Sequence, residues 1–187
     1  RVLKADMANI RSTMDELDLG AFERAIDMIL QARRIYVLGL RASAPLAMFL
    51  AHYLNFTSAR VTAVTSGVSD IFEQMFRIGP GDLLIGISFP RYTRRTVEAM
   101  HFARGRNASL IAITDGPLSP LHACADLCLS ARSDMASFVD SMAAPMSLIN
   151  ALIVAVGQRR RSEVGSFFRE MEEVWSQYDV YLKKGET

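Results

Sequence analysis

The segment DLLIGISFPRYTRRT, residues 82–96, decides how this chain folds. Its first part, 82–88, is apolar on both faces, which is typical of a strand buried inside a parallel sheet. A polar turn follows, and residues 93–105 then show the pattern of a helix. A buried strand, a turn and a helix in this order predict an α/β fold.

The same alternation of short apolar runs and helical segments continues along the chain on both sides of this segment. The runs predict strands at 35–39, 61–64, 82–88, 109–114 and 126–130, and the segments between them predict helices at 43–56, 68–77, 93–105 and 118–124. Because helices cover parallel strands on both faces, we predict a three-layer αβα domain with an open, doubly wound, five-stranded parallel sheet. In such sheets ligands bind at the carboxyl ends of the strands, where the strand order reverses.

Further helices are predicted at both ends of the chain. Residues 4–30 predict two helices broken near Leu19 and Gly20, and the very apolar stretch 141–157 predicts a closing helix with Asn150 as a core amide. A last amphipathic helix is predicted at 163–182. We therefore expect three parts, namely N-terminal helices for linking or dimerisation (1–34), the central domain (35–157) and a C-terminal helix that packs on the domain or on a partner (158–187).

The composition is that of an ordinary globular chain. Half of the 187 residues are hydrophobic and the net charge is +1, so the chain can build a core and has no overall basic field that would point to nucleic acid. Cys124 and Cys128 lack a second pair of ligands at zinc spacing, and we expect two buried thiols in a reducing cytoplasm. We expect no signal peptide, no membrane span and no metal site.

The turn after the first predicted strand, GLRASAP (39–45), is a candidate anion site. Gly39 lets the backbone turn tightly, and Pro45 is tolerated in the first turn of the helix that follows. Ser43 is expected to cap that helix, and a helix N-terminus with a free hydroxyl suits an anion. An alternative is that Ser43 is only a cap. The dinucleotide fingerprint G-x-G-x-x-G is absent, so no nucleotide cofactor is expected.

Hydroxyl side chains follow other predicted strands as well. Ser88 and Thr93 lie in the turn after the third strand and converge on a helix start in the same way. Ser66, in TSGVSD (65–70) after the second strand, is placed to meet a sugar hydroxyl or to serve as an ordinary turn residue. Asp140 and Ser141 directly precede the closing helix.

These features together resemble a sugar isomerase (SIS) domain, and most of all the effector-binding domain of RpiR-type transcriptional regulators. The resemblance covers about 35–157 and rests on G-x-x-x-S at 39–43, the turn that starts at Ser88, SLIAITD (109–115) and SMAAPMSLINALIVAV (141–156). It implies a flavodoxin-like SIS fold that binds a phosphosugar, and a helix-turn-helix domain in front of it through which the protein would contact DNA.

The turn after the third strand departs from the family pattern S-x-S-G-x-T. Ser88 and Thr93 match its first and last residues, but Pro90 replaces the second serine and Arg91 replaces the glycine. Because Pro90 has neither hydroxyl nor N–H and an arginine does not freely adopt φ > 0, we predict that the usual phosphate nest is damaged. Either the arginines substitute for it or the ligand is different. The resemblance and these turns predict the ligand-binding residues Arg41, Ser43, Ser66, Ser88, Arg91, Thr93 and Ser141, while Arg94 and Arg95 either assist or reach into solvent.

Three functions are compatible with this pattern. The first is a sensor of a small anionic metabolite such as a sugar phosphate. The second is an aldose–ketose isomerase, and the third is a dimerisation module with a vestigial pocket. Enzymes of the family supply a catalytic Glu and His near the closing helix or from a neighbouring subunit, whereas residues 131–157 contain neither. This absence favours a non-catalytic sensor. The outer helices, 4–30, 141–157 and 163–182, carry more apolar surface than the sheet needs, and this predicts a homodimer or tetramer.

Overall fold

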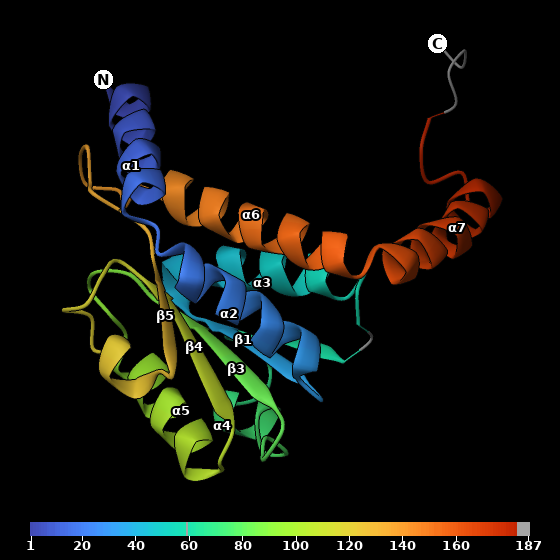
Figure 1. Ribbon diagram of the computed structural model, residues 1–187, viewed down its shortest axis with the longest axis horizontal. Helices are drawn as coiled ribbons and strands as arrows, with labels where there is room; N and C mark the ends of the chain where they lie inside the picture. Colours follow the sequence, from blue (N-terminus) through green and yellow to red (C-terminus); the bar gives the residue numbers. More distant parts are fainter. Residues whose placement is uncertain (59, 183–187) are drawn as a thin grey trace.

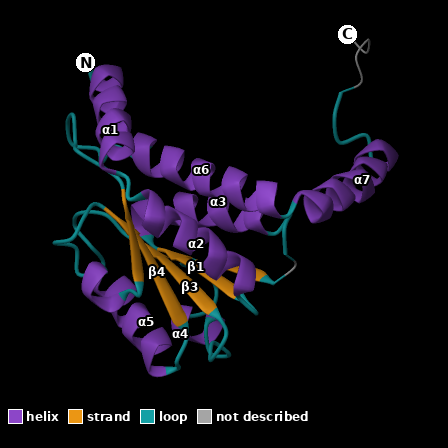
Figure 2. Cartoon of the chain, viewed as in Figure 1, coloured by secondary structure: helices purple, strands orange, loops and turns teal. Residues whose placement is uncertain are grey.

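The structure, a computed structural model, describes residues 1–58 and 60–182 (Figures 1 and 2). Its centre is one five-stranded parallel sheet with the strand order β2-β1-β3-β4-β5. The strands are β1 (Ile35–Gly39), β2 (Val61–Val64), β3 (Leu83–Ile87), β4 (Ser109–Thr114) and β5 (Leu127–Ser130). The strand order reverses between β1 and β3, which pair from Ile35 and Leu83 onward. The predicted doubly wound parallel sheet is therefore confirmed.

Helices cover both faces of the sheet. One face carries α2 (Leu19–Gln31), α3 (Ala44–Leu54) and α6 (Ala143–Arg159), and the other carries α4 (Ile71–Gln74) and α5 (Arg94–Gly105) (Figure 1). Alternate residues of each strand point to the two faces, so Val37 and Ile85 join one core while Leu38 and Leu84 join the other. Because α3 follows β1 and α5 follows β3, both helices begin at the carboxyl edge where the strand order reverses.

The N-terminal helices are divided two residues earlier than predicted. α1 (Val2–Glu16) ends before Asp18, whose side chain accepts a hydrogen bond from Ala21 N and so caps α2. The break near Leu19 and Gly20 was thus misplaced, because the capping aspartate and not the glycine sets the boundary.

Three other local predictions were wrong in detail. The helix expected at 68–77 is the single turn α4, which starts where Asp70 and Glu73 form a capping box. The helix expected at 118–124 is only a 3-10 turn, His122–Cys124. Asn150 is exposed on α6 and is not a core amide, since the apolar residues beside it, Leu148 and Ile149, are the ones that face the core.

The last helix, α7 (Arg161–Gln177), leaves the body of the domain at the end of α6 (Figure 1). Phe167 stacks on Phe56 at the junction, with ring centroids 4.6 Å apart. Phe168 also meets the Phe56 ring edge-on, yet α7 buries none of its residues, and Phe168 and Val174 are exposed. Packing of 158–187 on the domain or on a partner therefore stays a prediction, and residues 183–187 lie outside the described residues.

We expect the protein to be at least a dimer at micromolar concentrations. α1, α6 and α7 leave large apolar side chains exposed, among them Met7, Val154 and Phe168, and monomers rarely expose large contiguous apolar patches. Most helical stability in proteins comes from tertiary packing, and α7 buries none of its 17 residues within one chain. Light scattering coupled to gel filtration should give a multiple of the 20.8 kDa chain mass. A monomeric mass throughout the micromolar range would contradict this prediction.

The structure also locates the two cysteines. Cys124 is buried as predicted, Cys128 is only half-buried, and both are free thiols. Burial raises the pKa of both thiols above the ordinary value, so they are protonated at neutral pH. In the described part of the chain, no helix is both long and apolar enough to cross a membrane.

Candidate functional site

A cavity of about 600 Å³ opens between the carboxyl ends of β1 and β3, at the point where the strand order reverses. Two turns and the segment before α6 form its walls. The lining residues are Leu40, Arg41, Ala42, Ser43, Ser88, Phe89, Pro90, Arg91, Tyr92, Thr93, Arg94, Asp140 and Met142. Five of the seven predicted ligand-binding residues therefore lie together, namely Arg41, Ser43, Ser88, Arg91 and Thr93.

The turn after β1 brings Ser43 to this cavity without using it as a helix cap. Residues Arg41–Ser43 form a short 3-10 helix that runs directly into α3, and Ser43 has helical backbone angles with no capping hydrogen bond from its side chain. The predicted cap is therefore wrong. Ser43 is buried, and its hydroxyl has no hydrogen-bond partner within the described chain. The hydroxyl is available to a ligand.

Gly39 allows this turn to pass close to α3. A Cβ atom at position 39 would lie 2.7 Å from the Cβ of Ala47 and would also clash with the backbone of Ser43. Arg41 then reverses the chain with φ +55°, in the left-handed region. The close approach of this turn to α3 thus depends on a residue without a side chain at position 39.

The turn after β3 has a left-handed residue, Arg91, at the position where the family pattern has glycine. Arg91 adopts φ +63°, a left-handed conformation that an arginine was expected not to adopt freely. The strain costs about 1–2 kcal/mol for a residue with a Cβ atom. The backbone N–H groups of Arg91, Tyr92 and Thr93 find no acceptor among the described residues. The turn therefore retains free amides for an anion, although Pro90 supplies none.

The cavity carries an excess of positive charge. Arg41, Arg91 and Arg94 line it, and Asp140 is the only carboxylate among the described lining residues. Arg91 Nη2 lies 3.3 Å from Asp140 Oδ2, whereas Arg41 and Arg94 have no ion-pair partner in the described ranges. Two unpaired guanidinium groups suit a ligand with about two negative charges, such as a phosphate monoester.

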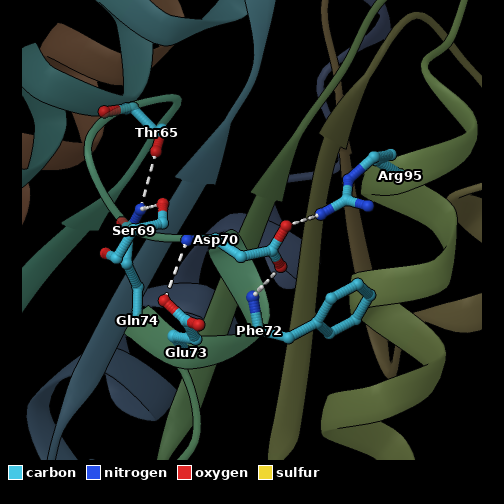
Figure 3. A network of polar contacts seen from close by, with 7 residues as sticks. All are labelled: Thr65, Ser69, Asp70, Phe72, Glu73, Gln74 and Arg95. Carbon is cyan, nitrogen blue, oxygen red and sulfur yellow. Dashed lines mark hydrogen bonds and ion pairs between the residues drawn. The ribbon is translucent and has the colours of Figure 1, made fainter.

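Arg95 has a different environment (Figure 3). It reaches from α5 to Asp70, the capping residue of α4, and its guanidinium lies 5.2 Å from the centre of the Phe72 ring. Gln74 holds the loop in front of α4 by donating to Thr65 O at 2.9 Å. Arg95 is therefore already neutralised.

Ser66 lies in a second cavity of about 580 Å³, which adjoins the first. The two cavities share four lining residues, Leu40, Arg41, Thr93 and Arg94. Ser66 thus lies beside the cavity that contains the other predicted residues, but it does not share a cavity with Ser43 and Ser88, which line the first cavity and not the second.

Ser141 does not line either of these cavities, although Asp140 and Met142 on both sides of it line the first. Its hydroxyl donates to Asp6 Oδ1 of α1 at 2.6 Å. A role for Ser141 in ligand contact stays a prediction, and the structure gives it a partner in the N-terminal helix.

Tyr92 was not predicted as a site residue. Its hydroxyl donates to Asp115 Oδ1 at 2.6 Å and ties the turn to the end of β4. Burial, together with this hydrogen bond, raises the pKa of Tyr92 to about 12, so the phenol is neutral at physiological pH. A tyrosine inside a ligand-binding turn is the only signal that the sequence offered for this role.

Comparison with known proteins identifies relatives of the chain. A family model described as the SIS domain matches residues 28–155. The HTH-type transcriptional regulator HexR of Pseudomonas aeruginosa is 28% identical over 180 residues, which cover 92% of this chain and 61% of that protein. HexR of Escherichia coli is 27% identical over 191 residues, which cover 97% of this chain and 64% of the relative. The chain therefore spans less than two thirds of the length of these regulators.

Solved structures show the same fold. The sugar isomerase domain of an RpiR transcription factor from Sphaerobacter thermophilus has a TM-score of 0.88 at 31% identity, with 92% of this chain and 96% of that domain covered. The Vibrio vulnificus NanR protein complexed with ManNAc-6P has a TM-score of 0.78 at 20% identity, with 94% and 67% covered. The family match extends over more than half of the residues and includes both turns of the cavity, and the chain belongs to the SIS domain family.

Proposed function

We propose that this domain is the ligand-sensing part of a bacterial transcriptional regulator and that it binds a phosphorylated sugar or a related anionic metabolite. The observation that carries the proposal is the turn after β3, where a left-handed Arg91 leaves free amides beside the Ser88 hydroxyl and three arginines. Its HTH-type relatives and the complex of NanR with ManNAc-6P support the same assignment. The DNA-binding function would belong to a helix-turn-helix domain, and the regulator would act in the cytoplasm.

The ligand's phosphate would lie against the β3 turn, where the amides and the first turn of α5 provide positive potential. The remainder of the molecule would extend toward Ser43 and the segment before α6, which complete the cavity. In this proposal residues 35–157 form the ligand-binding domain, and the helices in 1–34 and 158–187 link it to other domains or to a second copy.

A thermal-shift screen tests the proposal. A compound present at 100 times its Kd stabilises the fold by about 2.7 kcal/mol, which corresponds to a rise in Tm of roughly 5–10 °C for a domain of this size. We expect phosphorylated sugars or sugar acids to raise the Tm, and the unphosphorylated counterpart of each active compound to be a poor stabiliser. Equal stabilisation by charged and uncharged counterparts, or none by any anion at millimolar concentration, would overturn the proposal.

Isomerase activity is expected to be absent. Moving a proton between adjacent carbon atoms needs a base near the substrate and usually an acid for ring opening. Among the described residues that line the cavity there is no histidine, and the one carboxylate, Asp140, is paired with Arg91. Incubation with pentose and hexose phosphates should therefore leave them unchanged in a coupled or NMR assay. Turnover that survives further purification would contradict the assignment.

A further inference from the structure

Asp140 is poorly compatible with an anion in the cavity. Its side chain is only 14% exposed, and its ion-pair partner among residues 1–58 and 60–182 is Arg91, whose side chain is 78% exposed. An anion at the β3 turn would meet the Asp140 charge in a partly buried setting, where water and salt screen repulsion less than at the surface. It would also compete with Asp140 for the Arg91 guanidinium. Anion binding and the pairing of Arg91 with Asp140 therefore oppose each other.

The segment 131–142, which contains this carboxylate, also holds α1, which packs against α6 as well. The only two buried residues of α1, Asn9 and Thr13, are polar, and both bond to this segment. Four sets of contacts connect the two elements. They are Arg132 N to Thr13 Oγ1 at 2.9 Å, the Arg132 guanidinium to Glu16 at 2.7–3.1 Å, Asn9 Nδ2 to Asp134 O at 3.0 Å, and Ser141 Oγ to Asp6 Oδ1 at 2.6 Å.

We infer that an anion bound at the β3 turn draws Arg91 away from Asp140 and thereby weakens the docking of α1 on the segment 131–142. The path from the cavity to α1 is short, because Asp140 is covalently adjacent to Ser141, whose hydroxyl donates to Asp6 of α1. This inference rests on the proposed function and adds a means of regulation to it. In the proposed regulator, the DNA-binding domain would be joined on the side of α1 and would sense the change.

Thermodynamic reciprocity makes the link measurable from both directions. If anion binding weakens the docking of α1 by a given factor, undocking of α1 must strengthen anion binding by the same factor. The Asp140→Asn variant removes the competing charge with almost no change of shape. Asp134→Asn is the matched control, because Asp134 belongs to the same segment but its side chain has no ion pair within the described chain.

The experiment is hydrogen–deuterium exchange of the α1 amides, with inorganic phosphate as the probe and the amides of α7, at the far end of α6, as the internal reference (Figure 1). Saturating phosphate should accelerate exchange in α1 of the wild type by about two- to fivefold, the factor expected for one partly exposed ion pair. Asp140→Asn should exchange at the faster rate without phosphate, should change little on adding it, and should bind phosphate about two- to fivefold more tightly. Asp134→Asn should behave like the wild type.

The outcomes separate this inference from the proposed function. If phosphate raises the Tm of the wild type but leaves α1 exchange unchanged or slower, the coupling is wrong and the binding site stands. If phosphate does not bind, the coupling is tested by the Asp140→Asn variant alone. Faster exchange of the α1 amides than in the wild type supports the coupling, and an unchanged rate overturns it. Equal effects of Asp140→Asn and Asp134→Asn would also overturn the coupling, because they would show a general effect of charge.

Discussion

Gly39→Ala is expected to destabilise the domain by about 1–3 kcal/mol or more, the usual cost of overpacking a tight site. The new methyl group would meet the backbone of Ser43 and would lie 2.7 Å from the Cβ of Ala47, and backbone cannot move aside as a flexible side chain can. Relief requires the end of β1 and the start of α3 to separate. The Tm should fall by roughly 2–12 °C, and Ser43 should lose its place in the cavity.

Gly105→Ala provides the matched control. This glycine ends α5, and a Cβ atom there would meet no heavy atom within 4 Å. Alanine has the higher helix propensity, so the Tm of this variant should equal or exceed that of the wild type. Its free energy of unfolding should be higher by up to about 1 kcal/mol. If both variants melt like the wild type, the close approach at Gly39 is not a constraint on this fold.

The second large effect is on ligand affinity at the β3 turn. Arg91→Ala and Ser88→Ala should each weaken binding of the best compound from the screen by about 1–3 kcal/mol, or roughly 5- to 150-fold, as loss of a hydrogen bond to a charged group does. Affinity should fall more steeply with salt for the wild type than for Arg91→Ala, because the variant has one fewer charge. Titration calorimetry at two salt concentrations measures both. Unchanged affinity in both variants would make the turn purely structural.

Arg91→Gly separates the side chain from the backbone of the same turn. Glycine tolerates φ +63°, whereas alanine retains the strain, so Arg91→Gly should be about 1 kcal/mol more stable than Arg91→Ala. Both variants lack the guanidinium, so both should lose affinity. If Arg91→Gly binds as well as the wild type, the free amides of the turn hold the ligand without help from Arg91.

The sheet could be predicted from the sequence because the information is local. A strand covered on both faces must itself be apolar throughout, and IYVLG (35–39) and LLIGI (83–87) show this within five residues each. The clustering of Ser43 and Ser88 followed from the same reasoning, since parallel strands bring the residues after them to one edge. Asn150 was misplaced because helical periodicity alone does not say which face meets the core.

The sequence by itself determined the order of strands and helices, the edge at which the site lies, and most of the residues gathered there. Only the tertiary structure decided how those residues are used. Arg91 adopts a backbone conformation that is unfavourable for an arginine, because residues outside the turn hold the turn in place. Tyr92 donates to Asp115, and Ser88 N donates to Ile113 O. Ser141 bonds to Asp6, 135 positions away in the chain, and no local pattern carries information about a contact across such a distance.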